Sequence, residues 1–142
     1  AMWQCPNNDI ALAAIYGKYY NKFAAKLLAM DIGYYNAAKP TTPWGWNVPL
    51  RSQLTTLSGI GSNAAKMVGT NYWTTANGIN STGLSILGSG YRQANGTYAG
   101  SKTNAYILCQ DADYARVIND GDNTFNESAI TTEGGIIRLI KV

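Results

Sequence analysis

The sequence predicts a single α+β domain, and three observations lead to this prediction. The chain has 142 residues, which is the usual length of one domain. Only 13% of the residues are charged and 46% are hydrophobic, so the chain can form a core and is unlike a charge-rich disordered segment. Gly, Asn, Thr and Ser occupy 50 of the 142 positions, a composition typical of turns and short strands, and helical stretches precede a run of strands.

The first half of the chain predicts a strand, two helices and a connector. Aromatic and β-branched residues favour a strand at 15–22, although apolar spacing from Ile10 to Leu28 also fits a helix. An Ala-rich helix is expected at 24–30, followed by an extended connector over 31–49 that contains three prolines. Pro49 and the leucine spacing predict a helix at 50–57, ended by Gly59 and Gly61. A further helical turn is expected at 63–68.

The second half predicts short strands joined by tight turns. Asn77-Gly78 and Asn95-Gly96 are strong turn signals because both residue types tolerate a positive φ. The apolar runs between and after these turns are the expected strands, at 71–73, 84–87, 106–108, 115–118 and 134–142.

Composition also excludes several functions. There is no His, so a His base or a His-ligated metal cannot come from this chain. The net charge is +3, with dispersed lysines before residue 103 and clustered acids after it, so we expect no nucleic-acid binding. No apolar run approaches the roughly 20 residues that span a bilayer, so we expect no membrane insertion. Ala1-Met2 resembles a cloning remnant, and residues 1–142 are expected to be the C-terminal domain of a larger protein.

Five short blocks, in order, carry a resemblance to a known family. They are Tyr16–Asn21, Gly45–Pro49, Thr82–Arg92, Asn95–Tyr98 and Gly135–Leu139. Over residues 15–142 this order resembles the Fibrobacter succinogenes major paralogous domain family. The resemblance implies a C-type-lectin-like fold, in which two short helices accompany a small twisted antiparallel sheet and long loops.

The departures from the family pattern affect its disulfide. Thr42 and Leu139 stand where the family has Cys, so the implied disulfide is missing. Asn47 replaces a His, and Ile107–Asp111 replaces a Trp-rich block in the segment that displays ligand-facing residues in related folds. Cys5 and Cys109 are expected to be inert thiols, with a disulfide between them or a reactive thiol left open as alternatives.

Three other features have a structural interpretation beside a functional one. The acids from 111 to 133 could bind calcium, but only Ile118–Asp120 is similar to a lectin calcium motif, so we expect a solvated acidic loop and no metal. The tryptophans that could stack on sugars, Trp44, Trp46 and Trp73, are expected in the core or in turns. The glycines of 83–90 lack the Gly-Lys-Ser/Thr ending of a phosphate loop.

Residues 104–128 are the predicted recognition segment. They are rich in Asn, Asp and Tyr in an irregular pattern, and such side chains suit exposed recognition loops. The resemblance adds that retroelement-diversified variable proteins vary the corresponding region. The candidate ligand-binding residues are Gln110, Asp111, Asp113, Tyr114, Asn119, Asp122, Asn123, Phe125 and Asn126.

These observations predict a non-catalytic recognition module without a cofactor. We expect it in a virion, on a phage tail or receptor-binding protein, where it would bind a protein or glycan of a bacterial surface and contact other subunits of its particle. The missing disulfide favours a phage assembled in the reducing cytosol. The alternatives are a bacterial cell-surface or fimbrial-tip adhesin, and a purely structural decoration or connector domain of a virion.

Overall fold

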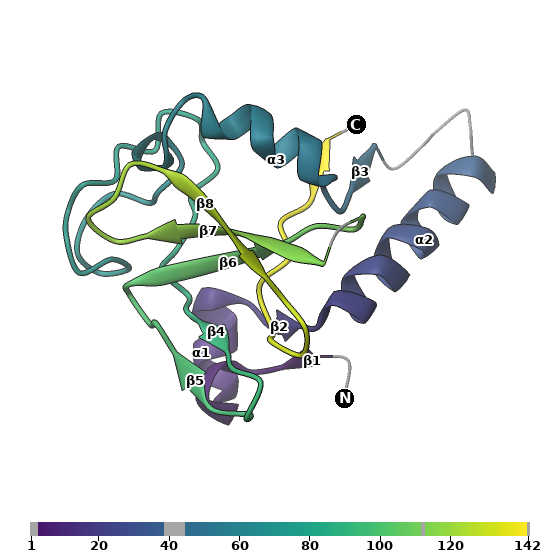
Figure 1. Cartoon of the computed structure of the whole chain (residues 1–142), viewed down its shortest axis with the longest axis horizontal. Helices are drawn as coiled ribbons and strands as arrows, with labels where there is room; N and C mark the ends of the chain where they lie inside the picture. Colours follow the sequence, from purple (N-terminus) through teal and green to yellow (C-terminus); the bar gives the residue numbers. More distant parts are fainter. Residues whose placement is uncertain (1–2, 39–44, 112, 142) are drawn as a thin grey trace.

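The computed structural model describes residues 3–38, 45–111 and 113–141 and shows a mixed α+β fold (Figure 1). In the first half, the 3₁₀ turns η1 (Pro6–Asn8) and η2 (Ser62–Ala64) accompany three helices, α1 (Ile10–Tyr16), α2 (Lys22–Ala38) and α3 (Arg51–Ser58). The strands are β1 (Trp3–Gln4), β2 (Tyr19–Tyr20), β3 (Trp46–Asn47), β4 (Tyr91–Arg92), β5 (Tyr98–Ala99), β6 (Asn104–Leu108), β7 (Tyr114–Asn119), β8 (Phe125–Ala129) and β9 (Ile140–Lys141).

The centre of the fold is an antiparallel sheet in the order β6-β7-β8. The remaining strands form the antiparallel pairs β1-β2, β3-β9 and β4-β5. Residues 134–136 join these parts, because Gly134 pairs with Arg92, Gly135 with Tyr20 and Ile136 with Ile107. The late segment therefore closes the free edge of β6.

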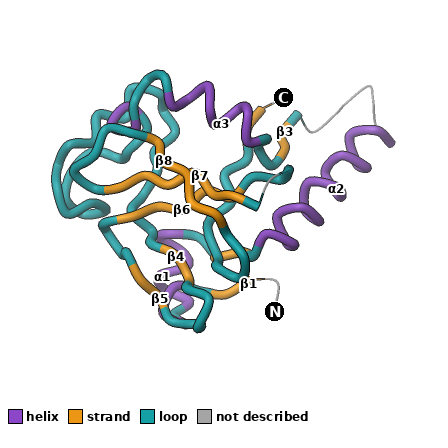
Figure 2. Tube along the Cα trace, viewed as in Figure 1, coloured by secondary structure: helices purple, strands orange, loops and turns teal. Residues whose placement is uncertain are grey.

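Both faces of the central sheet are buried. On one face, Ile107 of β6 and Ile118 of β7 pack in a core with Leu54 of α3 and the fully buried Trp73. On the other, Leu108 and Ala115 pack with Ala25 and Ala29 of α2, with Val48 and with Ile130. Figure 2 shows that the part of the chain between α3 and β4 in the sequence runs mainly as long loops.

The N-terminal region differs from the predicted strand at 15–22. Asp9 Oδ1 accepts a hydrogen bond of 2.8 Å from the Ala11 amide, so a helix begins at Ile10, and it ends before Gly17 at φ +82°. Only Tyr19 and Tyr20 form a strand. Asn21 then caps α2, which includes the predicted helix at 24–30 and continues through residues 31–38 of the expected connector.

Other elements agree with the prediction in part. The helix predicted at 50–57 is confirmed as α3, and the Asn95-Gly96 turn is confirmed between β4 and β5. The turn expected at 63–68 is only η2, and no regular strand forms at 71–73 or 84–87. Trp73 lies in the core as expected, Trp46 is 44% exposed, and Trp44 lies outside the described residues.

The predicted recognition segment is the central sheet and not a set of irregular loops. Residues 104–128 contain β6, β7 and most of β8, and the strands predicted at 106–108 and 115–118 lie within β6 and β7. The paired strands satisfy the backbone groups of this stretch, while its Asn and Asp side chains remain exposed or half-buried.

Candidate functional site

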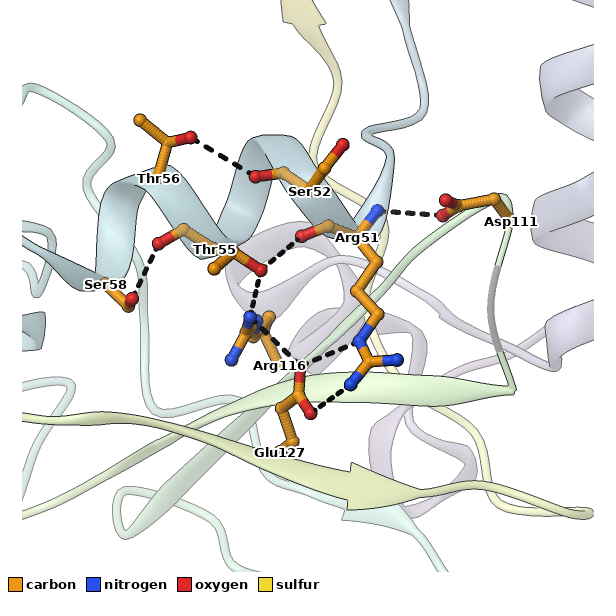
Figure 3. Close-up of polar contacts among 8 residues, drawn as sticks. All are labelled: Arg51, Ser52, Thr55, Thr56, Ser58, Asp111, Arg116 and Glu127. Atoms are coloured by element: carbon orange, nitrogen blue, oxygen red, sulfur yellow. Dashed lines mark hydrogen bonds and ion pairs between the residues drawn. The ribbon is translucent and has the colours of Figure 1, made fainter.

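A cluster of charged side chains joins α3 to the central sheet (Figure 3). The Glu127 carboxylate on β8 accepts hydrogen bonds from Arg51 Nε at 2.8 Å and Arg51 Nη2 at 2.5 Å. Arg116 Nη2 of β7 lies 3.0 Å from Glu127 Oε1 and also donates a hydrogen bond to the Thr55 hydroxyl of α3. The planar fork of Arg51 matches the carboxylate, so this contact fixes the orientation of both side chains.

The electrostatics of this cluster favour the charged forms. The hydrogen bonds from Arg51 hold the pKa of Glu127 below its usual value, and Glu127 raises the pKa of Arg51. Arg116 is only 7% exposed, and its buried Nε has no hydrogen-bond partner in the part of the chain that the structure describes. A carboxylate held by two guanidinium groups is a poor proton acceptor, so this arrangement suits a rigid scaffold better than acid–base chemistry.

Tyr114 and Asp111 extend the cluster to the surface. The Tyr114 ring lies 4.7 Å from the Arg51 guanidinium carbon, which is a cation–π distance, and Tyr114 is 40% exposed. Asp111 Oδ1 accepts a hydrogen bond of 2.8 Å from the Arg51 amide and so caps the first turn of α3. Leu50, 37% exposed, precedes this turn. We call Leu50, Arg51, Asp111 and Tyr114 the Arg51–Tyr114 surface.

Two other predicted residues near this surface fasten neighbouring elements. Asp113 lies 3.3 Å from Lys22 Nζ and 3.1 Å from Lys26 Nζ of α2, and these lysines lower its pKa. Gln110 Nε2 donates a hydrogen bond of 2.6 Å to the Val48 carbonyl. Both side chains contribute to the position of the segment between β6 and β7.

The remaining predicted residues lie toward the opposite end of β7. Asn119 accepts a hydrogen bond from Asn104, Asn123 accepts one from the Asn63 amide, and Asn126 donates one to Asp122. The Thr124 and Asn126 side chains hold the pKa of Asp122 below its usual value. The structure therefore divides the predicted site into two groups, and this second group organises the turn between β7 and β8.

Phe125 is placed in the core and not at a ligand surface. It is 7% exposed and packs with Ile118 and Trp73. Its position follows from the pairing of Ile118 with Phe125, which puts both side chains on the same face of the sheet. Phe125 therefore does not belong to a binding surface in this structure.

Asp120 and the two cysteines lie in surroundings that are explained by the fold. Asp120, from the lectin-like Ile118–Asp120, accepts hydrogen bonds from the Thr75 amide and hydroxyl. Within the described residues, no group of three or more Cys, Asp or Glu side chains is arranged to hold a metal ion. Cys5 and Cys109 are both free, and burial raises the pKa of Cys109 to about 11.

Sequence reasoning did not single out two charged features. Arg51 and Glu127 are far apart in the chain, and nothing local in the sequence marks them as partners. Lys66 is completely buried, and its ammonium donates hydrogen bonds to the Asp122 carbonyl at 2.6 Å and to Asn63 Oδ1 at 3.0 Å. Nothing in the sequence around Lys66, which lies between Ala65 and Met67, indicates that its side chain is buried.

No family model, curated protein or solved structure matches this chain. Across the described part of the chain, none of the helices combines the length and apolar character needed to cross a bilayer. The fold and the site thus define a mixed α+β protein with a rigid, charged and aromatic surface at the beginning of α3.

Proposed function

We propose that this chain is a non-catalytic recognition module of C-type-lectin-like type, displayed on a phage tail or receptor-binding protein. The observation that carries the proposal is the Tyr114 ring held over an Arg51 guanidinium that Glu127 already fixes. Tyr and Arg are enriched among the residues that dominate binding energies. Holding them before binding reduces the entropy that is lost when a partner docks.

The partner in this proposal is a protein or glycan of a bacterial surface. The same surface would serve equally on a bacterial surface or fimbrial-tip adhesin. Single copies would bind weakly, and repeated copies on one particle would raise the overall affinity through avidity.

A binding assay on intact cells tests the proposal. Fluorescent multimers of the domain are incubated with a panel of bacterial strains, and bound signal is compared between the wild type and Tyr114→Ala. Phe23→Ala is the matched control, because Phe23 is an exposed aromatic residue (63%) on α2, outside the Arg51–Tyr114 surface.

We expect Tyr114→Ala to reduce binding to a recognised strain by about tenfold or more, an interface loss of roughly 1.4 kcal/mol or more. Phe23→Ala should bind as the wild type does. The proposal fails if no strain is bound, or if the two variants bind equally.

A structural role in a virion is the second candidate, and an apolar stripe on α2 favours it. Phe23, Leu27 and Met30 follow one another at helical spacing and are 63%, 48% and 72% exposed. Adjacent exposed apolar side chains are typical of protein–protein contacts. In that case the stripe would attach the domain to another subunit. Leu27→Asp would then impair particle assembly, and the free wild-type domain would bind no bacterial strain.

A further inference from the structure

A concave site lies at the end of the molecule away from α3, where Figure 1 shows β1, β2 and β4. A pocket of about 240 Å³ is lined by residues of β1, β2 and β4 and of the segment before the last strand. Its lining residues are Trp3, Gln4, Tyr19, Tyr20, Asn21, Arg92, Thr132 and Gly134. Pairing of β1 with β2 and of Arg92 with Gly134 fixes the walls.

Arg92 is the one charged residue among those that line this pocket, and its charge is not compensated by the fold. Among the described residues, its buried Nε has no hydrogen-bond partner, and none of the ion pairs includes Arg92. The described residues that line the pocket include no Asp or Glu. Guanidinium groups that are partly removed from water are normally paired with a carboxylate, so the pocket lacks its natural counter-charge.

Two polar residues that line the pocket with Arg92 can donate hydrogen bonds to a ligand. Asn21 Oδ1 already accepts a hydrogen bond of 2.8 Å from the Ala24 amide, so its Nδ2 is left to donate. Thr132 lines the pocket, and its hydroxyl makes no hydrogen bond among the described residues. A carboxylate needs donors alone and carries the charge opposite to that of Arg92, so Arg92, Asn21 and Thr132 together fit a carboxylate.

Two further features increase the positive potential here. Lys18 Nζ lies 3.6 Å from the centroid of the Trp3 ring, which is one wall of the pocket. The 17-residue helix α2 begins directly after Asn21, so its positive end lies on the same side. Trp3 is 43% exposed and provides an aromatic surface against which the body of a ligand can pack.

We propose that this pocket binds the carboxylate group of a ligand, with the terminal nitrogens of Arg92 as the principal partner and Asn21 and Thr132 as additional donors. The ligand would be an acidic sugar or an acidic peptide side chain, since both present the same planar group. The site is separate from the Arg51–Tyr114 surface and does not depend on the function proposed for it.

An NMR titration of ¹⁵N-labelled protein at low ionic strength tests this site. The Trp3 indole and Asn21 side-chain amide signals are followed while sodium glucuronate is added, with glucose as the matched neutral sugar. A second titration uses N-acetylglutamate amide, so that the tighter of the two carboxylates identifies the source. We expect saturable shifts with at least one carboxylate at millimolar concentrations and none with glucose.

Variants assign the effect to the pocket. Arg92→Gln should weaken carboxylate binding by about tenfold or more, since a charge-assisted contact is lost, and Thr132→Val by about threefold. Thr132→Val also serves if Arg92→Gln does not fold. Tyr114→Ala should leave the titration unchanged, which separates this site from the proposed recognition surface. The proposal is overturned if neither carboxylate gives a saturable shift, if glucose gives equal shifts, or if the folded pocket variants bind as the wild type does.

Discussion

Replacing Lys66 by Met removes a buried ammonium group that holds the β7–β8 turn against the loop after α3. The ammonium donates hydrogen bonds to the Asp122 carbonyl at 2.6 Å, to Asn63 Oδ1 at 3.0 Å and to Asn77 Oδ1 at 3.4 Å. Lys66 itself is 0% exposed, so water cannot replace these contacts without local opening. Methionine keeps the length of the side chain and offers no donor.

The size of the stability loss in Lys66→Met follows from the two shorter of these hydrogen bonds. Leaving a buried acceptor without a donor costs about 1–3 kcal/mol, so two of them cost roughly 2–6 kcal/mol. The variant also avoids the cost of burying a charge, which offsets part of this loss. We therefore expect the free energy of unfolding to fall by about 2–4 kcal/mol.

Urea unfolding followed by tryptophan fluorescence measures this loss, because the buried Trp73 ring lies 5.3 Å from Lys66 Nζ. Lys141→Met is the matched control on an exposed lysine of β9 and should change stability by less than about 0.5 kcal/mol. If Lys66→Met stays within about 0.5 kcal/mol of the wild type, the buried ammonium does not organise this turn.

The burial of Lys66 also predicts how the stability of the protein changes with pH. Burial lowers the pKa of Lys66 in the folded state, so between that pKa and the ordinary value of 10.5 the unfolded chain binds more protons. The stability of the wild type relative to Lys66→Met should therefore rise as the pH increases within this window. A decrease over the same range would contradict the burial of Lys66. Comparison with the variant removes the contribution of the tyrosines.

Two further predictions concern the thiols and the glycines. Burial raises the pKa of Cys109 to about 11, so iodoacetamide at pH 8 should modify Cys5 alone in the folded protein and both thiols after unfolding. Mass spectrometry measures which thiol is modified. Rapid modification of Cys109 in the folded protein would contradict the prediction. Gly90→Ala should destabilise the fold by roughly 3 kcal/mol or more, since Gly90 has φ +77° and an added Cβ would overlap the Ala99 carbonyl oxygen. Gly17→Ala, at φ +82° with open space around it, should cost only about 1–2 kcal/mol in the same unfolding assay, and equal losses would show that the overlap is relieved.

Local signals in the sequence were sufficient for several elements. The leucine spacing after Pro49 predicts α3, and Asn95-Gly96 predicts the β4–β5 turn, because in both cases the determining residues are neighbours in the chain. The strand predicted at 15–22 is wrong over most of its length. Residues 15–16 belong to α1, which the Asp9 cap and Gly17 delimit, only Tyr19 and Tyr20 form a strand, and Lys22 begins α2.

The candidate site was harder to predict because its contacts are long-range. Asp111 and Asp113 resemble ligand-facing acids in the sequence. In the structure, Asp111 accepts a hydrogen bond from the first residue of α3, and Asp113 pairs with two lysines of α2, and both helices lie far earlier in the chain. Phe125 looks exposed among polar neighbours, and only its pairing with Ile118 reveals that it lies in the core. Tyr114 is the predicted residue that remains open to solvent beside a fixed cation.

The closure of β6 by residues 134–136 has a consequence for biosynthesis. A nascent chain makes the three central strands before residues 134–136. Until Ile136 arrives, the Tyr106 carbonyl and the Leu108 amide on the outer edge of β6 lack the backbone partner that they have in the folded protein. An open strand edge of this kind can pair with another polypeptide, so the interval before the last segment emerges is the time at which crowded copies are most prone to misassembly.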